Sequence, residues 1–243
     1  MTPRADVLGC AIDRLDMTGT LDAVEETIAA GRFTQHMSIN AAKLVTMHED
    51  ARMREIIASC GLVSADGQSV VWASRLLGDA LPERVAGIDL MQRLLHVAEH
   101  RGHRVFFLGA TPQVLARAVE AITFRHPRLH VAGSRDGYFG PEEEPQVRGE
   151  IRAAAPDILF VAMPSPRKER WVAAAAGLDV GFAMGVGGSL DVLAGLVRRA
   201  PRPVQRLGLE WLFRLAQEPR RLLRRYVTTN TRFLALLIRE VTT

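Results

Sequence analysis

The chain has little cysteine, almost no lysine and no apolar run long enough to cross a bilayer. Its two cysteines, Cys10 and Cys60, lie in separate apolar segments and form no CxxC pair. This argues against a disulfide framework or a cysteine zinc site and predicts buried thiols in a reducing compartment. No apolar run reaches the roughly 18 residues that a spanning helix needs, since even the hydrophobic C-terminal tail is interrupted by Arg, Glu and Pro. Any membrane contact is therefore expected to be peripheral.

Several catalytic and targeting motifs are also absent. The sequence has no GxSxG elbow, HExxH, P-loop or DxD, and no glycine fingerprint at its first strand-to-helix turn. Acidic residues inside the N-terminal apolar stretch argue against a signal peptide. His96 and His100 are four residues apart, with His103 beyond them, but no acid or cysteine at a matching spacing completes a metal set. We therefore expect neither a cofactor nor a metal.

Positive charge is concentrated at the C-terminal end. Residues 198–243 hold 11 arginines and 3 acidic residues, a net charge of +8, whereas the whole chain is only +4, so residues 1–197 carry −4. Leucines and aromatic residues alternate with these arginines at helical spacing, which favours an anionic, partly apolar surface. We predict a catalytic domain over 1–197 and a basic helical appendage over 198–243 that binds a membrane, or another copy of the chain, as a peripheral segment.

Short apolar runs alternate with helical patterns, which is typical of an α/β fold with a Rossmann-like, mostly parallel sheet and helices on both faces. The predicted strands lie near 6–12, 34–39, 61–65, 104–109, 129–133, 157–162 and 179–184. The predicted helices begin near Thr20, Ala41, Gln68, Gly87, Pro112, Glu142, Pro166 and Ser189, with a further helix in the appendage at Pro219.

Ligands of such sheets bind at the carboxyl ends of the strands, so the residues that follow each strand are the candidates for chemistry. Asp66 ends a strand, where it is either a helix cap or a general base. Ser38 and Asn40 end another strand and can point a hydroxyl and an amide into the same crevice. Arg84 either binds a diphosphate or pairs with Glu83 or Asp89.

Three further loops could hold an anion. The exit at Gly109, before Thr111 and Pro112, is either a phosphate cradle or an ordinary capped helix. Lys168 and its neighbour Arg167 stand at a helix start, where cations oppose the helix dipole, which suggests an anionic partner or a solvated pair. The last loop carries three glycines that let a ligand approach the backbone, and an aspartate that can accept hydroxyl groups: Gly185, Gly187, Gly188 and Asp191.

Read in order, these loops resemble the WecG/TagA/CpsF family of bacterial glycosyltransferases, glycosyltransferase family 26. The matching stretches cover nearly the whole chain in the order of the family: SIN (38–40), SADGQSVVWASRLLG (64–78), LPERVAGIDLM (81–91), VFFLGATP (105–112), DGYF (136–139), PDILFVAMPSPRKERW (156–171), GVGGSLDVLAGLVRRAP (185–201) and RLGLEWLFRLAQEPRRLLRRY (206–226).

The resemblance implies an inverting transfer of a sugar from a UDP-sugar to a polyprenyl-diphosphate-linked saccharide. The reaction would take place at the inner face of the bacterial plasma membrane, in the synthesis of exopolysaccharide, capsule or teichoic acid. It also implies a Rossmann-like fold whose C-terminal appendage closes over the active site at the membrane.

The resemblance assigns roles to individual residues. Asp66 matches the proposed catalytic base, Ser38 and Asn40 match a Thr-x-Asn pair, and Arg84 matches the Arg of an R-x-x-G stretch. Arg214, Arg221 and Arg224 match arginines thought to hold a diphosphate. Lys168 departs from the family, since many members have Gln at this position, so the donor sugar is not carried over.

In the expected mechanism UDP lies across the glycine loops, with its uridine near Tyr138, Gly187 and Asp191 and its diphosphate near the helix start after Gly109. Asp66 deprotonates the acceptor, arginines stabilise the departing UDP, and no metal is strictly required. Two other classes compete with this one. An NAD(P)-dependent oxidoreductase is disfavoured by the missing fingerprint. A nucleic-acid-binding module would leave the glycine-rich strand exits unexplained, so no nucleic acid partner is expected.

Overall fold

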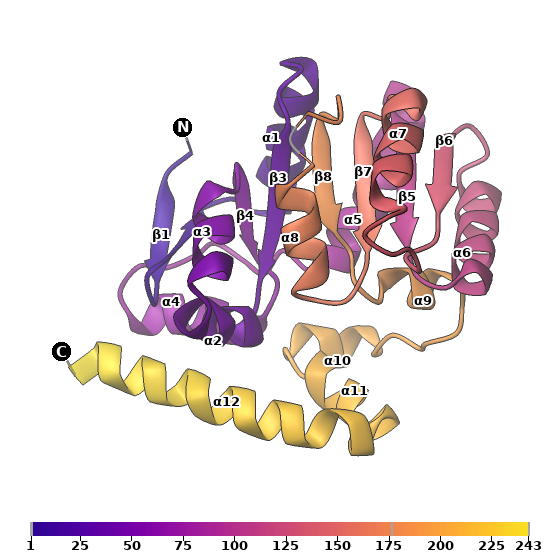
Figure 1. The fold of residues 1–243 in the computed structure, drawn as a ribbon. Coiled ribbons are helices and arrows are strands. Elements are labelled where there is room, and N and C mark those ends of the chain that lie inside the picture. Colours follow the sequence, from indigo (N-terminus) through magenta and orange to yellow (C-terminus); the bar gives the residue numbers. More distant parts are fainter. Residues whose placement is uncertain (1, 176, 243) are drawn as a thin grey trace.

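The structure, a computed structural model, describes residues 2–175 and 177–242 of the chain. Its centre is a six-stranded parallel sheet in the order β4-β3-β8-β7-β5-β6 (Figure 1). The strands are β3 (Thr34–Ile39), β4 (Leu62–Ala65), β5 (Arg104–Gly109), β6 (His130–Arg135), β7 (Ile158–Ala162) and β8 (Phe182–Gly185). The α/β, Rossmann-like class predicted from the sequence is confirmed, and within the described residues this central sheet is entirely parallel.

Helices cover both faces of the sheet because the central strands are apolar on both sides. In β5, Val105 and Phe107 belong to one core cluster, whereas Phe106 and Leu108 belong to another. The helices on the first face are α1 (Met17–Ala29), α5 (Gly87–Arg101), α6 (Pro112–Arg125) and α9 (Ser189–Leu193). Those on the second face are α2 (Ala41–Glu49), α3 (Ala51–Ser59), α7 (Glu144–Ala154) and α8 (Arg167–Ala173).

The N-terminal segment differs from the prediction. In place of one strand over 6–12, the chain forms an antiparallel hairpin of β1 (Arg4–Val7) and β2 (Cys10–Asp13). Leu8 and Gly9 both have positive φ, 55° and 73°, as a tight two-residue hairpin turn requires. Asp13 joins this hairpin to β4, because its Oδ2 accepts the backbone N–H of Val63 at 2.7 Å. The single predicted strand is therefore wrong.

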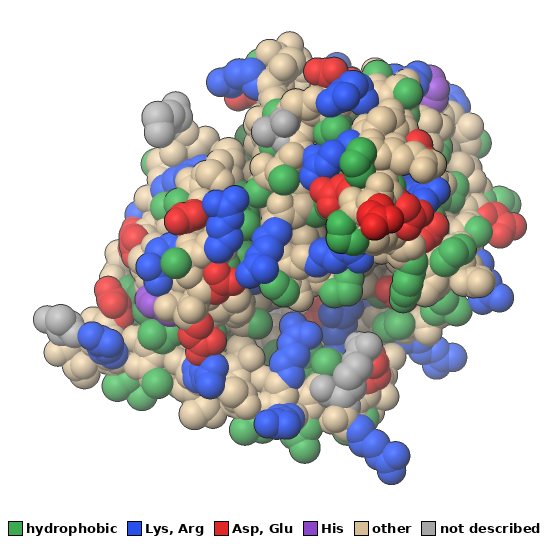
Figure 2. Space-filling view, in the orientation of Figure 1, with side chains coloured by type: hydrophobic (Ala, Val, Ile, Leu, Met, Phe, Trp, Pro, Cys, Tyr) green, Lys and Arg blue, Asp and Glu red, His purple; other side chains and the backbone are tan. Residues whose placement is uncertain are grey.

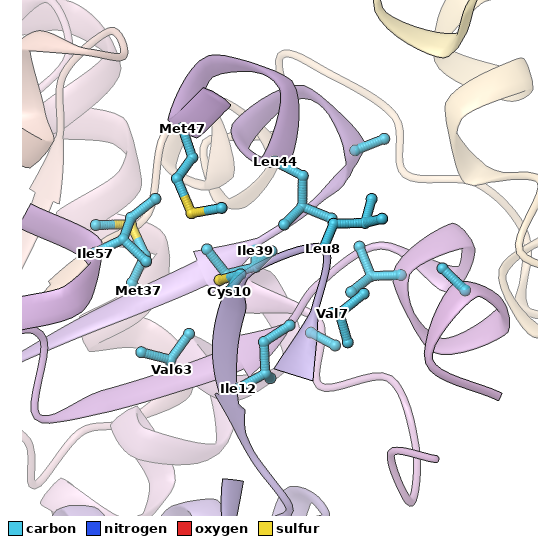
Figure 3. Packing of buried hydrophobic residues seen from close by; sticks show 14 of the residues in the cluster. Val7, Leu8, Cys10, Ile12, Met37, Ile39, Leu44, Met47, Ile57 and Val63 are labelled. Carbon is cyan, nitrogen blue, oxygen red and sulfur yellow. The ribbon is translucent and has the colours of Figure 1, made fainter. Parts of the chain in front are cut away.

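The other predicted strands are present, and the predicted helix starts fall within three residues of the observed ones. Helix α3 was not predicted as a separate element. Asp50 separates it from α2 by accepting the backbone N–H groups of Arg52 and Met53. Helix α4 (Gln68–Leu76) packs with α2, α3 and the hairpin in one apolar cluster (Figure 3). Cys10 and Cys60 belong to this cluster as free thiols, and burial raises the pKa of each to about 12.

The C-terminal segment lies along the carboxyl edge of the sheet (Figure 1). It consists of α10 (Arg202–Arg206), α11 (Glu210–Gln217) and α12 (Pro219–Thr242), so the predicted helix start at Pro219 is confirmed. Helix α12 packs against α2, and its Phe233, only 5% exposed, joins the apolar cluster of Figure 3. Among the described residues no helix is both long and apolar enough to cross a membrane. The division into domains at 197/198 stays a prediction.

Candidate active site

Asp66 lies at the carboxyl end of β4, where the sequence predicts it. Its Oδ1 accepts the backbone N–H of Gly87 at 2.8 Å, at the start of α5. It does not cap α4, whose cap position, Gly67, has no side-chain cap bond. The carboxylate therefore links β4 to the start of α5 through Oδ1. This structural bond leaves the second oxygen, Oδ2, for the predicted role as a base.

Ser38 and Asn40 lie beside Asp66 because β3 pairs with β4 in register, Ser38 with Ser64 and Ile39 with Ala65. Ser38 is buried, and its hydroxyl has no hydrogen-bond partner among the described residues. A Cβ at Gly87 would lie 3.1 Å from Ser38 Oγ. Asn40 caps α2, its Oδ1 accepting the backbone N–H of Lys43 at 3.1 Å. The three predicted polar residues thus come together at one end of the crevice, and their catalytic roles stay predictions.

Lys168 has an internal anionic partner. Its Nζ lies 3.2 Å from Oε1 of Glu169, and the same oxygen lies 3.3 Å from Nζ of Lys43, on α2. Burial lowers the pKa of Lys168, and the nearby charge of Lys43 lowers it further. The cations at this helix start therefore do not by themselves require a ligand. Two ammonium groups against one carboxylate still leave the cluster with a net charge of +1.

Replacing Glu169 with Gln is expected to lower the free energy of unfolding by about 3–5 kcal/mol, because it leaves two largely buried ammonium groups without their carboxylate. Urea denaturation measures this loss. In the control Glu55→Gln, whose ion pair with Arg52 is 66% exposed on each side, the change should stay within about 0.5 kcal/mol. A similar small change in Glu169→Gln would contradict the prediction.

The same cluster predicts a dependence of stability on pH. Burial alone would raise the pKa of Glu169, but Lys43 and Lys168 together lower it below its ordinary value of 4.5. A carboxyl group whose pKa is lower in the folded protein stabilises the fold fully above its unfolded pKa and loses that contribution as the pH falls through the folded pKa. The acid-induced loss of stability below pH 4.5 should therefore be smaller in Glu169→Gln than in the wild-type protein.

The glycines after β8 make room for protein side chains. A Cβ at Gly185 would lie 2.9 Å from Cε of Lys168. The aliphatic part of the Lys168 side chain therefore occupies the space beside this glycine, where the sequence analysis expected a ligand. Next to it, a Cβ at Gly188 would lie 3.6 Å from Oδ2 of Asp191 and 3.8 Å from Nη2 of Arg214. Arg214 comes from α11, so the appendage places a guanidinium group against the glycine loop, as the resemblance implies.

Gly187, with φ of 51°, turns the chain between these two positions, and a Cβ there would lie 3.9 Å from Nζ of Lys168. The ammonium group of Lys168 therefore lies beside Gly187, and the guanidinium group of Arg214 lies beside the next residue, Gly188. Both charges face the strand exit that the sequence assigned to the donor.

The predicted phosphate cradle at Gly109 has a different explanation. A Cβ at this residue would lie 2.4 Å from the carbonyl oxygen of Ala162, and φ is 120°, so only glycine fits between β5 and β7. The next N–H, of Ala110, already donates to that carbonyl at 2.9 Å. This N–H is not free for a phosphate, and the packing alone accounts for Gly109.

Tyr138 lies beyond β6, at the edge of the sheet, and its side chain is 73% exposed. Three strand spacings of about 4.8 Å separate β6 from β8, so Tyr138 and Gly187 follow strands that lie roughly 14 Å apart. Arg167 connects the two regions, because it donates to the carbonyl oxygens of Gly137 at 3.1 Å and Phe139 at 2.8 Å. The loop of Tyr138 is thus fixed to the start of α8.

Arg84 is engaged by the appendage. Its Nη1 lies 3.2 Å from Oε2 of Glu210, on α11, and the other oxygen of Glu210 accepts from Nε of Arg199 at 3.1 Å. Arg199 also forms a bidentate pair with Asp89, at 2.5 and 2.7 Å. These four charged residues join the appendage to α5, where Asp89 stands two residues after Gly87, the residue that Asp66 binds. Of the alternatives that the sequence left open for Arg84, pairing with Glu83 or Asp89 is not found among the described residues, and Glu210 is the acid that it contacts.

A cleft of about 410 Å³ opens between this network and the appendage, lined by Gln68, Glu83, Arg84, Arg202 and Gln205. In Figure 2, blue Lys and Arg side chains gather along the hollow between the sheet and the appendage. Arg224 is exposed on α12, and the side chain of Arg221 lies outside the described residues. The structure therefore brings Arg84 and Arg214 to the carboxyl edge and leaves Arg224 in solvent.

Sequence reasoning did not find Glu169 and Glu210, which pair with the predicted site residues Lys168 and Arg84. It also did not find Lys43 and Arg199, which pair in turn with these two acids. Glu169 and Glu210 stand in the first turns of α8 and α11, where acids are common for helix-dipole reasons alone. Lys43 and Arg84, which pair with these two acids, lie far from them in the sequence, so nothing local predicts that the two acids are enclosed by cations.

A comparison with protein families agrees with this geometry over almost the entire chain. The model of the family described as "Glycosyl transferase WecG/TagA/CpsF family" matches residues 5–243, which includes the sheet, the carboxyl-edge loops and the appendage. The match therefore covers Asp66, the glycine loop and Arg214 of α11 together. The chain belongs to the WecG/TagA/CpsF family of glycosyltransferases.

Proposed function

We propose that this glycosyltransferase moves a sugar from a UDP-sugar to a polyprenyl-diphosphate-linked saccharide, with inversion at the anomeric carbon. The observation that carries the proposal is the convergence of one carboxylate, Asp66, with cations from three separate segments along a single edge of the sheet. Arg84, Lys168 and Arg214 come from the loop before α5, from α8 and from the appendage. A diphosphate leaving group and an acceptor hydroxyl need this combination of charge and base.

The reaction is a single displacement. Asp66 accepts the proton of the acceptor hydroxyl, whose oxygen forms a bond to the anomeric carbon while the bond from that carbon to the diphosphate oxygen breaks. UDP leaves with the bonding electron pair, and the cations stabilise its developing negative charge. Attack from the face opposite the leaving group inverts the anomeric centre. In this scheme arginine and lysine neutralise the charge, so the transfer itself needs no metal.

The donor diphosphate fits best near Gly188, where Arg214 approaches the glycine loop and the Lys168 cluster contributes its net positive charge. Asp191 then offers a carboxylate to the ribose or sugar hydroxyl groups, and the exposed ring of Tyr138 offers a stacking surface for uracil. Lys168 stands where glutamine is common in the family, and we propose that this cation influences which donor sugar the enzyme accepts.

The acceptor lipid would approach from the side of the appendage. Helix α12 buries Phe233 against the body, while a second face, about 100° around the helix from Phe233, carries a stripe of exposed apolar side chains: Leu223, Val227, Leu234, Ile238 and Val241. Their spacings of 4, 7, 4 and 3 residues place them on one side of the helix, next to arginines. We propose that this outer face binds the anionic inner surface of the plasma membrane, where cell-surface polysaccharides are assembled.

A thermal-shift comparison tests the donor class. UDP and UDP-sugars should raise the melting temperature of the purified protein, whereas GDP-mannose and NAD should not. In Arg214→Gln the apparent affinity for UDP, obtained from the concentration dependence of the shift, should fall at least 10-fold. The variant loses one charge-assisted contact of about 1.5–3 kcal/mol. The control Arg220→Gln removes an equally exposed arginine of α12 and should behave as the wild-type protein.

Two outcomes would contradict the donor assignment. A shift with NAD and none with any uridine nucleotide would favour the dehydrogenase alternative. A uridine-specific shift that Arg214→Gln leaves unchanged would remove the appendage from donor binding.

A further inference from the structure

Three metal-ligating side chains meet at the edge of the sheet opposite the candidate active site. His96 and Glu99 lie one turn apart on α5, and His126 is the C-cap residue of α6. One donor atom from each of the three lies within 4.8 Å of the other two. Both helices end at this edge, because β5 and β6 begin there at Arg104 and His130. Nothing in the proposed transfer reaction uses these residues.

Glu99 is held in place as an ionised ligand. Its side chain is only 8% exposed, and its two oxygens accept from Nδ1 of His126 at 2.9 Å and from the backbone N–H of Arg128 at 3.2 Å. These two hydrogen bonds hold the pKa of Glu99 below its ordinary value. Because a carboxylate only accepts, Nδ1 of His126 carries a hydrogen in the metal-free protein. In the Nε2–H tautomer the lone pair of Nδ1 is free, and an ion can take the place of that hydrogen between Nδ1 and the Glu99 oxygen, which are already 2.9 Å apart.

The His96 ring is available to a ligand. It is exposed, and its nitrogens make no hydrogen bond within the described part of the chain. It lies against His100 with ring centroids 4.2 Å apart and near His126 at 6.4 Å. Around a tetrahedral zinc ion with bonds of about 2.0–2.1 Å, ligand atoms stand roughly 3.3 Å apart. The three ligand atoms now lie up to 4.8 Å apart. Rotation of the exposed His96 side chain, with small shifts of Glu99 and His126, can shorten these separations to the roughly 3.3 Å that zinc requires.

We propose that His96, Glu99 and His126 bind a divalent transition-metal ion, zinc by the chemistry of the donors, that joins the C-terminal ends of α5 and α6. Two imidazoles and one carboxylate, with water in the remaining position, are a ligand set that zinc accepts. The ion also places positive charge at two helix C-termini, where the helix dipoles favour it. Its role is structural, because the site lies at the amino ends of the strands and Asp66 lies at their carboxyl ends.

Calorimetric titration of the metal-free protein with Zn²⁺ tests the proposal, with Co²⁺ as a spectroscopic substitute. We expect one ion per chain, visible absorption bands of low-coordinate Co²⁺, and a rise in melting temperature of roughly 5–10 °C at 100 times the dissociation constant. His96→Gln alters only an exposed ring and should weaken binding at least 10-fold without affecting the fold. Glu99→Gln keeps the shape of the side chain and should do the same.

His100→Gln is the matched control, because His100 is equally exposed and adjacent but is not one of the three ligands. Its Nδ1 donates to the carbonyl oxygen of His96 at 2.8 Å. Binding in this variant should equal that of the wild-type protein. The proposal is overturned by the absence of one-to-one binding, by unchanged binding in both His96→Gln and Glu99→Gln, or by loss in His100→Gln, which would place the ion on the exposed pair of histidines. UDP binding is a separate readout, so failure here leaves the transferase proposal standing.

Discussion

Replacing Asp66 with Asn is expected to reduce turnover by about 10²–10⁴-fold, the usual contribution of a general base, while leaving UDP binding nearly unchanged. Asparagine keeps an oxygen that can accept from the backbone N–H of Gly87, so the link between β4 and α5 survives and the fold is preserved. The amide cannot take a proton from the acceptor hydroxyl. Steady-state transfer to a lipid-linked acceptor and a parallel UDP titration separate the two effects.

Asp157→Asn is a suitable control for this substitution. The carboxylate of Asp157 accepts the backbone N–H of Arg104 at 2.7 Å, almost the geometry of Asp66 and Gly87, but it lies at the amino ends of β5 and β7. Its substitution should cost a similar, small amount of stability and leave turnover intact. Wild-type turnover in Asp66→Asn, or an equal loss in both variants, would remove Asp66 from the role of base.

The double variant Leu234→Gln with Ile238→Gln is expected to lower partitioning onto anionic vesicles by about 100-fold. The two side chains are 54% and 63% exposed on the outer face of α12, and each forfeits roughly 1.5 kcal/mol of apolar transfer. Glutamine is a good helix former, so α12 should persist. Transfer to a long-chain lipid acceptor should fall in parallel, whereas transfer to a short, water-soluble acceptor should not.

Thr228→Gln with Ala235→Gln controls for this change, since both residues are exposed on α12 and each is turned about 100° around the helix from the stripe residue before it, Val227 and Leu234. Vesicle sedimentation and light scattering should be measured together. Unchanged vesicle binding in the Leu234/Ile238 variant, with a halved molecular mass, would assign the stripe to self-association and contradict the membrane proposal.

Much of the site was accessible from sequence because parallel sheets align their strand exits. Asp66, Ser38 and Asn40 each follow an apolar strand, and the register of β3 with β4 brings them together as predicted. Arg214 was predicted only through the family resemblance, and the structure brings it to Gly188. Gly109 and Gly185 were interpreted as possible openings for a ligand, whereas in the structure Ala162 and Lys168 fill the space beside them, and a role of these glycines in binding stays a prediction.

The metal-ligand cluster shows the same limit. Within the sequence, His96, His100 and His103 looked like an incomplete stripe, and Glu99 was overlooked although it stands three residues after His96. The third ligand, His126, is separated from Glu99 by all of β5 and α6. Only the tertiary fold, in which α5 and α6 share one apolar cluster on the same face of the sheet, brings it within reach.

By itself the sequence determined the α/β class, the strand exits, the basic amphipathic appendage and the family, because periodicity, turn residues and local charge are properties of neighbouring residues. The tertiary structure decided which charges meet. It paired Arg84 with Glu210, placed Glu169 between Lys43 and Lys168, and set Arg214 against the glycine loop. The interaction energy of two charges depends on the distance between them in space. Packing between segments that are far apart in the sequence sets this distance, so no local sequence pattern predicts it.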